Sequence, residues 1–176
     1  EKHMDAKVQE LINDQINKEL YSAYLYLTFA DFYKDAGLDG YANFYEVQAQ
    51  EERDHAMIFR KYLLENDVCP KMAAIAEPDK TFAPGDWMGP LQAAYEHEQY
   101  VTSLINGIYA AASEVKDYRA MKFLEWFISE QMEEEDTARD MITKMEIFGN
   151  DARSLYELNS DLAGRAYHVP SPLASK

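Results

Sequence analysis

A chain of 176 residues, 47% of them hydrophobic, can form one domain with its own core, and a single cysteine excludes a disulfide framework or a thiolate metal cluster. The formal net charge of -15 at pH 7, without any block of Lys and Arg, argues against a nucleic-acid partner; most of the excess Asp and Glu hydrates the surface, and the favoured ligands are cations. No stretch is apolar enough to span a membrane or to form a signal peptide, so we expect a cytoplasmic location without a membrane partner.

Apolar residues recur at helical spacing, and Gly and Pro are few, which indicates an all-α protein. The predicted helices span about residues 5–36, 41–66, 90–115, 118–148 and 152–163. Gly37 and Gly40 are expected to separate the first two helices, and Gly149 and Gly164 to end the last two. We interpret residues 1–3, which precede Met4, as a cloning remnant. The expected single domain and the polar tail after it occupy residues 4–165 and 166–176.

The lengths of the connections predict the topology. Short turns after the first and third helices produce two antiparallel hairpins. The connection between the second and third helices is interrupted by Pro70, Pro78 and Pro84 and has no helical pattern. About twenty extended residues reach roughly 65 Å, whereas a helix of about 25 residues is only ~38 Å long. We therefore expect a four-helix bundle with one long crossover, plus a short fifth helix.

Each of the four long helices carries one carboxylate in its apolar row. These four acids are Glu19, Glu52, Glu98 and Glu134. Burying a lone carboxylate costs several kcal/mol, and four acids that converge would also repel one another. Two divalent metal ions supply the positive charge that such a cluster needs. Counting residues from the turns places Glu98 and Glu134 within ~3 Å of the same height, but leaves a mismatch of ~10 Å between Glu19 and Glu52 before helix tilt.

The second helix adds an imidazole, because His55 lies one turn after Glu52 on the same face. Two inward acids plus Glu-x-x-His pairs on the other two helices form a known di-metal pattern of helical bundles. In the fourth helix, Thr137 stands where a second His would complete the pattern. The two positions are therefore expected to differ: one is formed by Glu19, Glu52 and His55, the other by Glu52, Glu98 and Glu134. Oxygen-rich ligands with one imidazole suit Fe(II), Mn(II) or Zn(II), which leaves the metal open.

At these residues the chain resembles the non-haem ferritins of bacteria and archaea, from Met4 to about Arg165. The segments that carry the resemblance are residues 17–26, 50–55, 95–99 and 123–135. The resemblance implies a ferritin-like bundle in a hollow shell of twenty-four subunits. Such a shell oxidises Fe(II) with O2 or hydrogen peroxide at a di-iron centre and stores the ferric mineral inside.

The resemblance also implies roles for further residues. Gln131 matches a position that supports the second iron position. A third iron position is implied at Glu51, Glu130 and Glu133. Tyr26 matches a tyrosine beside the centre, either a one-electron donor or simply a packed core aromatic. The fifth helix matches the element that packs around the fourfold axes of the shell.

Differences from related families narrow the expectation. Haem-binding bacterioferritins carry a methionine between the Glu and His of the second helix, where this chain has Arg53 and Asp54, so no haem is expected. A single Cys69 excludes the Cys-rich domain of rubrerythrins. Two alternatives remain: a di-iron or di-manganese carboxylate oxidase without storage, and a metal-free acidic bundle that binds partners through a Tyr-rich surface.

Overall fold

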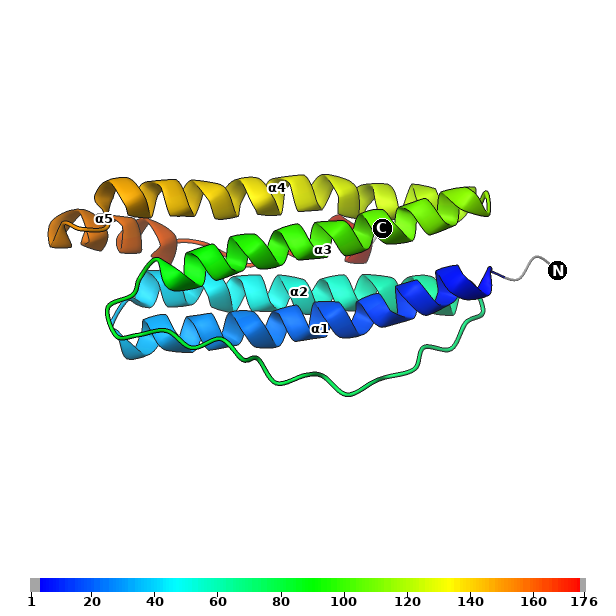
Figure 1. The fold of residues 1–176 in the computed structure, drawn as a ribbon, viewed down its shortest axis with the longest axis horizontal. Coiled ribbons are helices and arrows are strands. Elements are labelled where there is room, and N and C mark those ends of the chain that lie inside the picture. The colour runs from blue at the N-terminus through cyan, green and yellow to red at the C-terminus, as the bar shows by residue number, and fades with distance from the viewer. Residues whose placement is uncertain (1–3, 175–176) are drawn as a thin grey trace.

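Four long helices lie side by side in the computed structural model, which describes residues 4–174 (Figure 1). The helices are α1 (Ala6–Asp35), α2 (Asp39–Glu65), α3 (Gly89–Glu114), α4 (Tyr118–Phe148) and α5 (Ala152–Ala163), followed by the 3-10 turn η1 (Ser171–Leu173). Helix α1 pairs with α2, α3 pairs with α4, and α5 packs mainly on α2. The all-α bundle with one long crossover and a short fifth helix is confirmed. The expected cloning remnant, residues 1–3, lies outside the described residues.

The crossover, residues 66–88, runs along the outside of α1 for the length of the bundle (Figure 1). Asn13 holds it at Lys71, because its amide donates to the Lys71 carbonyl at 3.0 Å and accepts from the Lys71 N–H at 2.8 Å. One turn further along α1, the Asn17 amide donates to the Ala74 carbonyl at 2.9 Å. These side-chain bonds satisfy backbone groups that have no helix or sheet of their own. Among residues 4–174, no helix is both long enough and apolar enough to cross a membrane.

The turn between α1 and α2 corrects one expectation. Gly37 ends α1 with a φ of +80°, as expected for a glycine after a helix. Gly40, expected to break the helix, instead lies in the first turn of α2. The carbonyl oxygen of Asn159 in α5 lies 1.6 Å from where a Gly40 Cβ would stand. Gly40 is therefore required by the close approach of α5, which the local pattern around Gly40 does not reveal.

Helix α5 and the start of α2 cap each other. Leu38, the N-cap residue of α2, makes no side-chain cap bond. The Asn159 side chain in α5 provides the missing cap. Its Oδ1 accepts hydrogen bonds from the N–H groups of Gly40 at 2.8 Å and Tyr41 at 3.1 Å. In return, the Asn43 amide donates to carbonyls at the end of α5, including that of Leu162 at 3.1 Å. The two asparagines fix where the chain leaves α5.

The apolar core has two parts, with a polar layer between them. One cluster extends from Val8 and Ile12 to Leu63 and Phe127, and the other contains Tyr26, Phe29, Tyr45 and Met141. In every long helix, the inward acid lies in sequence between the residues of the two clusters. Counted from the observed helix ends, Glu19 precedes Asp35 by 16 residues and Glu52 follows Asp39 by 13 residues, so the mismatch in height shrinks from the expected ~10 Å to ~5 Å.

Candidate metal centre

The four acids and the histidine predicted from the sequence are all buried in this layer. The exposed fractions are 1% for Glu19, Glu52 and His55, 3% for Glu98 and 9% for Glu134. Each residue lies on the buried face of its helix, in a row that also contains buried apolar residues. Burial of four carboxylates in one layer is costly unless a positive charge accompanies them.

The first group consists of Glu19, Glu52 and His55, whose ligand atoms all lie within 4.8 Å of one another. His55 Nδ1 lies 3.3 Å from Glu52 Oε2 and 3.9 Å from Glu19 Oε2. Within the described residues, neither His55 Nδ1 nor Glu19 Oε2 has a hydrogen-bond partner. Buried polar atoms rarely lack a partner. Two such atoms only 3.9 Å apart fit a bound metal ion.

The second group consists of Glu52, Glu98 and Glu134, again with ligand atoms within 4.8 Å of one another. Glu52 therefore belongs to both groups and lies between them. The Tyr26 hydroxyl donates a hydrogen bond to Glu98 Oε1. Gln131 donates to the other oxygen, Glu98 Oε2, at 3.0 Å and so holds the plane of this carboxylate. This group offers only oxygen ligands, which makes the two positions chemically unequal.

Burial raises the pKa of all four carboxyl groups. For Glu19 the second cause is the charge of Glu52, and for both Glu52 and Glu134 it is the charge of Glu98. Like charges in a buried site favour protonation over ionisation. A divalent cation reverses this preference because it replaces the protons and interacts with the ionised oxygens.

The third iron position implied by the resemblance has a different geometry. Glu51, Glu130 and Glu133 line one cavity of about 360 Å³, but the close group of ligand atoms there is His55, Glu130 and Glu134. Glu130 Oε1 lies 4.0 Å from His55 Nε2. Glu51 is instead paired with Arg165 at 2.8 Å. The third position stays a prediction.

Two glutamines beside the acids were missed in the sequence. Gln15 Nε2 donates to Glu19 Oε1 at 3.1 Å, and Gln48 Nε2 donates to Glu52 Oε1 at 3.3 Å. Each glutamine precedes its acid by four residues, so helical spacing could have identified both. Gln48 Nε2 also donates to Glu134 Oε2 at 2.6 Å, a link between helices that spacing cannot show.

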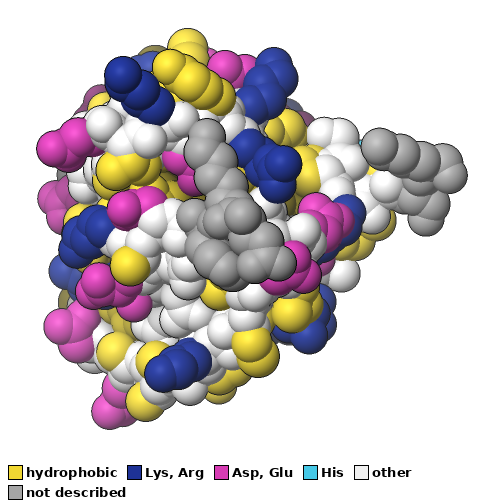
Figure 2. Space-filling view, turned by 90° about the vertical axis from the view of Figure 1, so that its right-hand side faces the viewer, with side chains coloured by type: hydrophobic (Ala, Val, Ile, Leu, Met, Phe, Trp, Pro, Cys, Tyr) yellow, Lys and Arg dark blue, Asp and Glu magenta, His cyan; other side chains and the backbone are white. Residues whose placement is uncertain are grey.

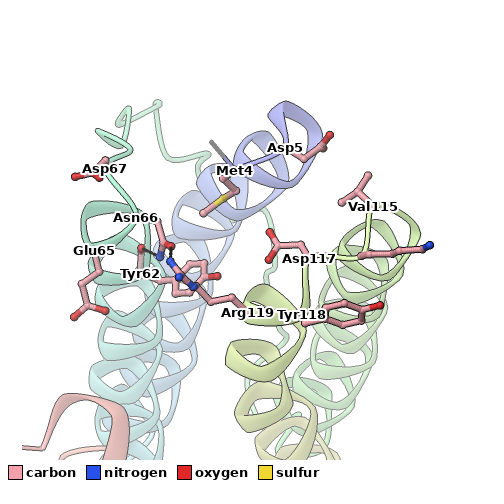
Figure 3. Close-up of a pocket in the computed structure, with 11 residues that line it drawn as sticks. Met4, Asp5, Tyr62, Glu65, Asn66, Asp67, Val115, Asp117, Tyr118 and Arg119 are labelled. Atoms are coloured by element: carbon pink, nitrogen blue, oxygen red, sulfur yellow. Dashed lines mark hydrogen bonds between the residues drawn. The ribbon is translucent and has the colours of Figure 1, made fainter. Parts of the chain in front are cut away.

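A larger cavity, of about 550 Å³, opens at the far end of the bundle from α5 (Figure 3). Its lining includes Tyr62, Asn66 and Arg119, and the Arg119 guanidinium donates to Asn66 Oδ1 at 2.9 Å. Basic and acidic side chains are interspersed over this end of the molecule (Figure 2). Within the described part of the chain, none of the close groups of metal-ligand atoms includes a residue of this cavity. Among the described residues, the candidate metal ligands therefore lie in the buried layer and not around this cavity.

Comparisons with known proteins agree with this geometry. Residues 9–148 match the ferritin family, described as a ferritin-like domain. The chain is 35% identical over 153 residues to a bacterial non-heme ferritin of Campylobacter jejuni, covering 87% of this chain and 90% of that protein. It is 37% identical to the open pore ferritin of the archaeon Archaeoglobus fulgidus, with a TM-score of 0.89 over 93% of this chain and 99% of that one. Because the family model covers most of the chain, and because the buried carboxylates and one histidine form a ferroxidase-type cluster, the chain belongs to the ferritin family.

Proposed function

We propose that this protein oxidises Fe(II) at the buried centre with O2 or hydrogen peroxide, and stores the ferric product inside a closed shell of copies of itself. The observation that carries the proposal is the pair of three-residue groups that share Glu52. Two ions held on either side of one carboxylate are close enough to react with the same oxidant molecule. The first ion is assigned to Glu19, Glu52 and His55, and the second to Glu52, Glu98 and Glu134.

The residues of the centre each contribute a distinct property. Each Fe(II) gives up one electron, so two ions together supply two electrons. These electrons reduce one O2 to hydrogen peroxide, or one hydrogen peroxide to two water molecules, and either reaction takes up two protons. Carboxylate oxygens favour Fe(III) over Fe(II) because they carry negative charge, which helps oxidation. His55 offers the nitrogen ligand, while Tyr26 and Gln131 hold the Glu98 carboxylate.

Storage and the shell are supported by the relatives rather than by the single chain. The relatives from Campylobacter jejuni and Staphylococcus haemolyticus are both named bacterial non-heme ferritins. Their name agrees with the expectation that no haem is bound here, which stays a prediction. A shell of twenty-four subunits and a cytoplasmic location also stay predictions. The number of subunits can be measured on the purified protein, and the location can be measured in the cells that produce it.

Loading with Fe(II) separates this proposal from its alternatives. Metal-free protein is mixed with excess Fe(II) without oxygen, air is then admitted, and bound iron per chain is measured after removal of free iron. Storage gives far more than two iron atoms per chain, an oxidase without storage stops at two, and an acidic interaction bundle retains almost none. Size-exclusion chromatography with light scattering on the same sample tests whether a closed shell forms.

A matched pair of variants tests the assigned centre. Glu52→Ala removes the carboxylate shared by both groups and is expected to abolish fast Fe(II) oxidation. Glu146→Ala removes an exposed carboxylate of α4 and is expected to retain the rate of the unmodified protein. An initial rate of Glu52→Ala equal to that of the control would contradict the assignment.

A further inference from the structure

Arg165, which follows the end of α5, reaches back to the edge of the metal centre. Its Nη1 donates to the Phe44 carbonyl at 2.9 Å, and the guanidinium carbon lies 4.2 Å from the centre of the Phe44 ring. Its Nη2 donates to Gln48 Oε1 at 2.9 Å and to Glu51 Oε2 at 2.8 Å. The planar fork of a guanidinium allows one side chain to make all of these contacts at once.

The contact with Gln48 determines which way the Gln48 amide faces. An amide has an acceptor oxygen on one side and a donor nitrogen on the other. With Arg165 donating to the oxygen, the nitrogen faces the carboxylates and donates to Glu52 Oε1 at 3.3 Å and Glu134 Oε2 at 2.6 Å. The reversed amide would place its oxygen against two carboxylate oxygens and its nitrogen against the guanidinium. Both contacts would then be repulsive.

We propose that Arg165 is a positioning residue of the metal centre, which acts through Gln48 to hold the carboxylates of Glu52 and Glu134 in the geometry that binds the second ion. The two residues that it orders belong to the second group, and Glu52 also belongs to the first. Groups behind the metal ligands that fix the orientation of those ligands contribute substantially to metal affinity. This inference rests on the proposed function, because it requires that metal ions bind to these carboxylates.

The position of Arg165 is itself held by the fold. The Asn43 amide donates to the Arg165 carbonyl at 3.0 Å, and the Arg165 N–H donates to the Leu162 carbonyl at 3.2 Å. The docking of α5 on the start of α2 therefore delivers the guanidinium to Gln48. Arg165 lies beyond residues 9–148, the segment that matches the ferritin family. The fifth helix and Arg165, two residues after its end, thus contribute to the metal centre as well as to packing.

The test measures metal occupancy in crystals, without any turnover. Metal-free crystals of the unmodified protein, Arg165→Gln, Gln48→Met and the double variant are soaked in limiting Co(II), and anomalous scattering gives the occupancy of each position. Arg153→Gln, which changes an exposed arginine of α5, is the matched control. Thermal unfolding of each metal-free variant shows whether the fold is retained.

The expected result is that the occupancy of the second position, relative to that of the first, falls about tenfold in Arg165→Gln and stays unchanged in Arg153→Gln. Because Arg165 acts through Gln48, adding Arg165→Gln to Gln48→Met should cause no further loss. An equal loss in the presence and absence of Gln48, or unchanged occupancy in Arg165→Gln, would overturn the inference. If the unmodified protein itself takes up no Co(II) at the centre, the proposed function fails instead, so the two failures are distinct.

Discussion

His55 Nδ1 lies 3.3 Å from Glu52 Oε2, one helical turn away on α2. In the proposed centre, His55 is the nitrogen ligand of the first position. The corresponding turn of α4 carries Thr137 after Glu134, so the second position has oxygen ligands alone. Imidazole binds divalent transition metals more tightly than a neutral oxygen ligand does. The inequality of the two positions follows from one residue difference between α2 and α4.

Thr137→His is expected to make the two positions nearly equal. Thr137 lines a small pocket together with Glu98 and Glu134, so an imidazole at this place can reach the second group. We expect the affinity of the second position for Zn(II) to increase about tenfold, or about 1.4 kcal/mol. Isothermal titration of metal-free protein measures the two steps. Thr143→His, on an exposed turn of α4, is the control; an equal gain in both variants would show that the new ligand acts elsewhere.

The stability of the metal-free protein is expected to depend on pH through the buried acids. Their pKa values are raised in the folded protein above the ordinary value of 4.5, so the folded state retains protons that the unfolded chain loses. Their stabilising contribution is therefore complete below pH 4.5 and is lost as the pH rises through the folded pKa values. Bound Zn(II) removes this loss, because the cation stabilises the ionised form.

Glu134→Gln isolates this effect at a single residue. Without metal, the neutral side chain is expected to raise the free energy of unfolding by about 1 kcal/mol at about pH 7, and by much less at about pH 4.5. When Zn(II) is added, the free energy of unfolding should rise less in Glu134→Gln than in the unmodified protein, because the second position has lost a ligand. Urea unfolding with a chelator or with Zn(II) measures both. A gain that does not vary with pH would show that the Glu134 carboxyl is not desolvated.

Tyr26→Phe tests whether Tyr26 donates an electron. Burial, followed by the charge of Glu98, raises the pKa of Tyr26, so the phenol stays neutral and donates to Glu98. Oxidation of the phenol would remove one electron and one proton, and Glu98 is placed to accept the proton. We expect a transient tyrosyl radical in freeze-quenched samples of the unmodified protein and of Tyr24→Phe, an exposed control. If Tyr26→Phe shows the same radical, Tyr26 is a packing residue.

Asn159→Ala tests the cap that α5 supplies to α2. Loss of an N-cap side chain costs about 1–2 kcal/mol, and here two N–H groups lose their acceptor. The free energy of unfolding in urea should fall by that amount, and the amide hydrogens of Gly40 and Tyr41 should exchange faster with solvent. Asn150→Ala, at an exposed position before α5, should change neither. Unchanged exchange at Gly40 would refute the role of Asn159.

The sequence predicted those features that depend on periodicity within one helix. The four inward acids and His55 each stand in an apolar row, so their burial followed from spacing alone. Gly40 and Arg165 could not be interpreted in this way. Gly40 is required by the backbone of Asn159, and Arg165 acts on Gln48, which is more than a hundred residues earlier in the chain. Contacts of this kind depend on how α5 docks, and local pattern contains no information about docking.

The most direct measurement of the central claim is the position of iron in the protein. Metal-free crystals are soaked in Fe(II) without oxygen, and anomalous scattering at the iron edge locates the bound ions. We predict two ions in the buried layer, one among Glu19, Glu52 and His55 and the other among Glu52, Glu98 and Glu134. Iron found solely at surface carboxylates, with these side chains turned away from one another, would contradict the account.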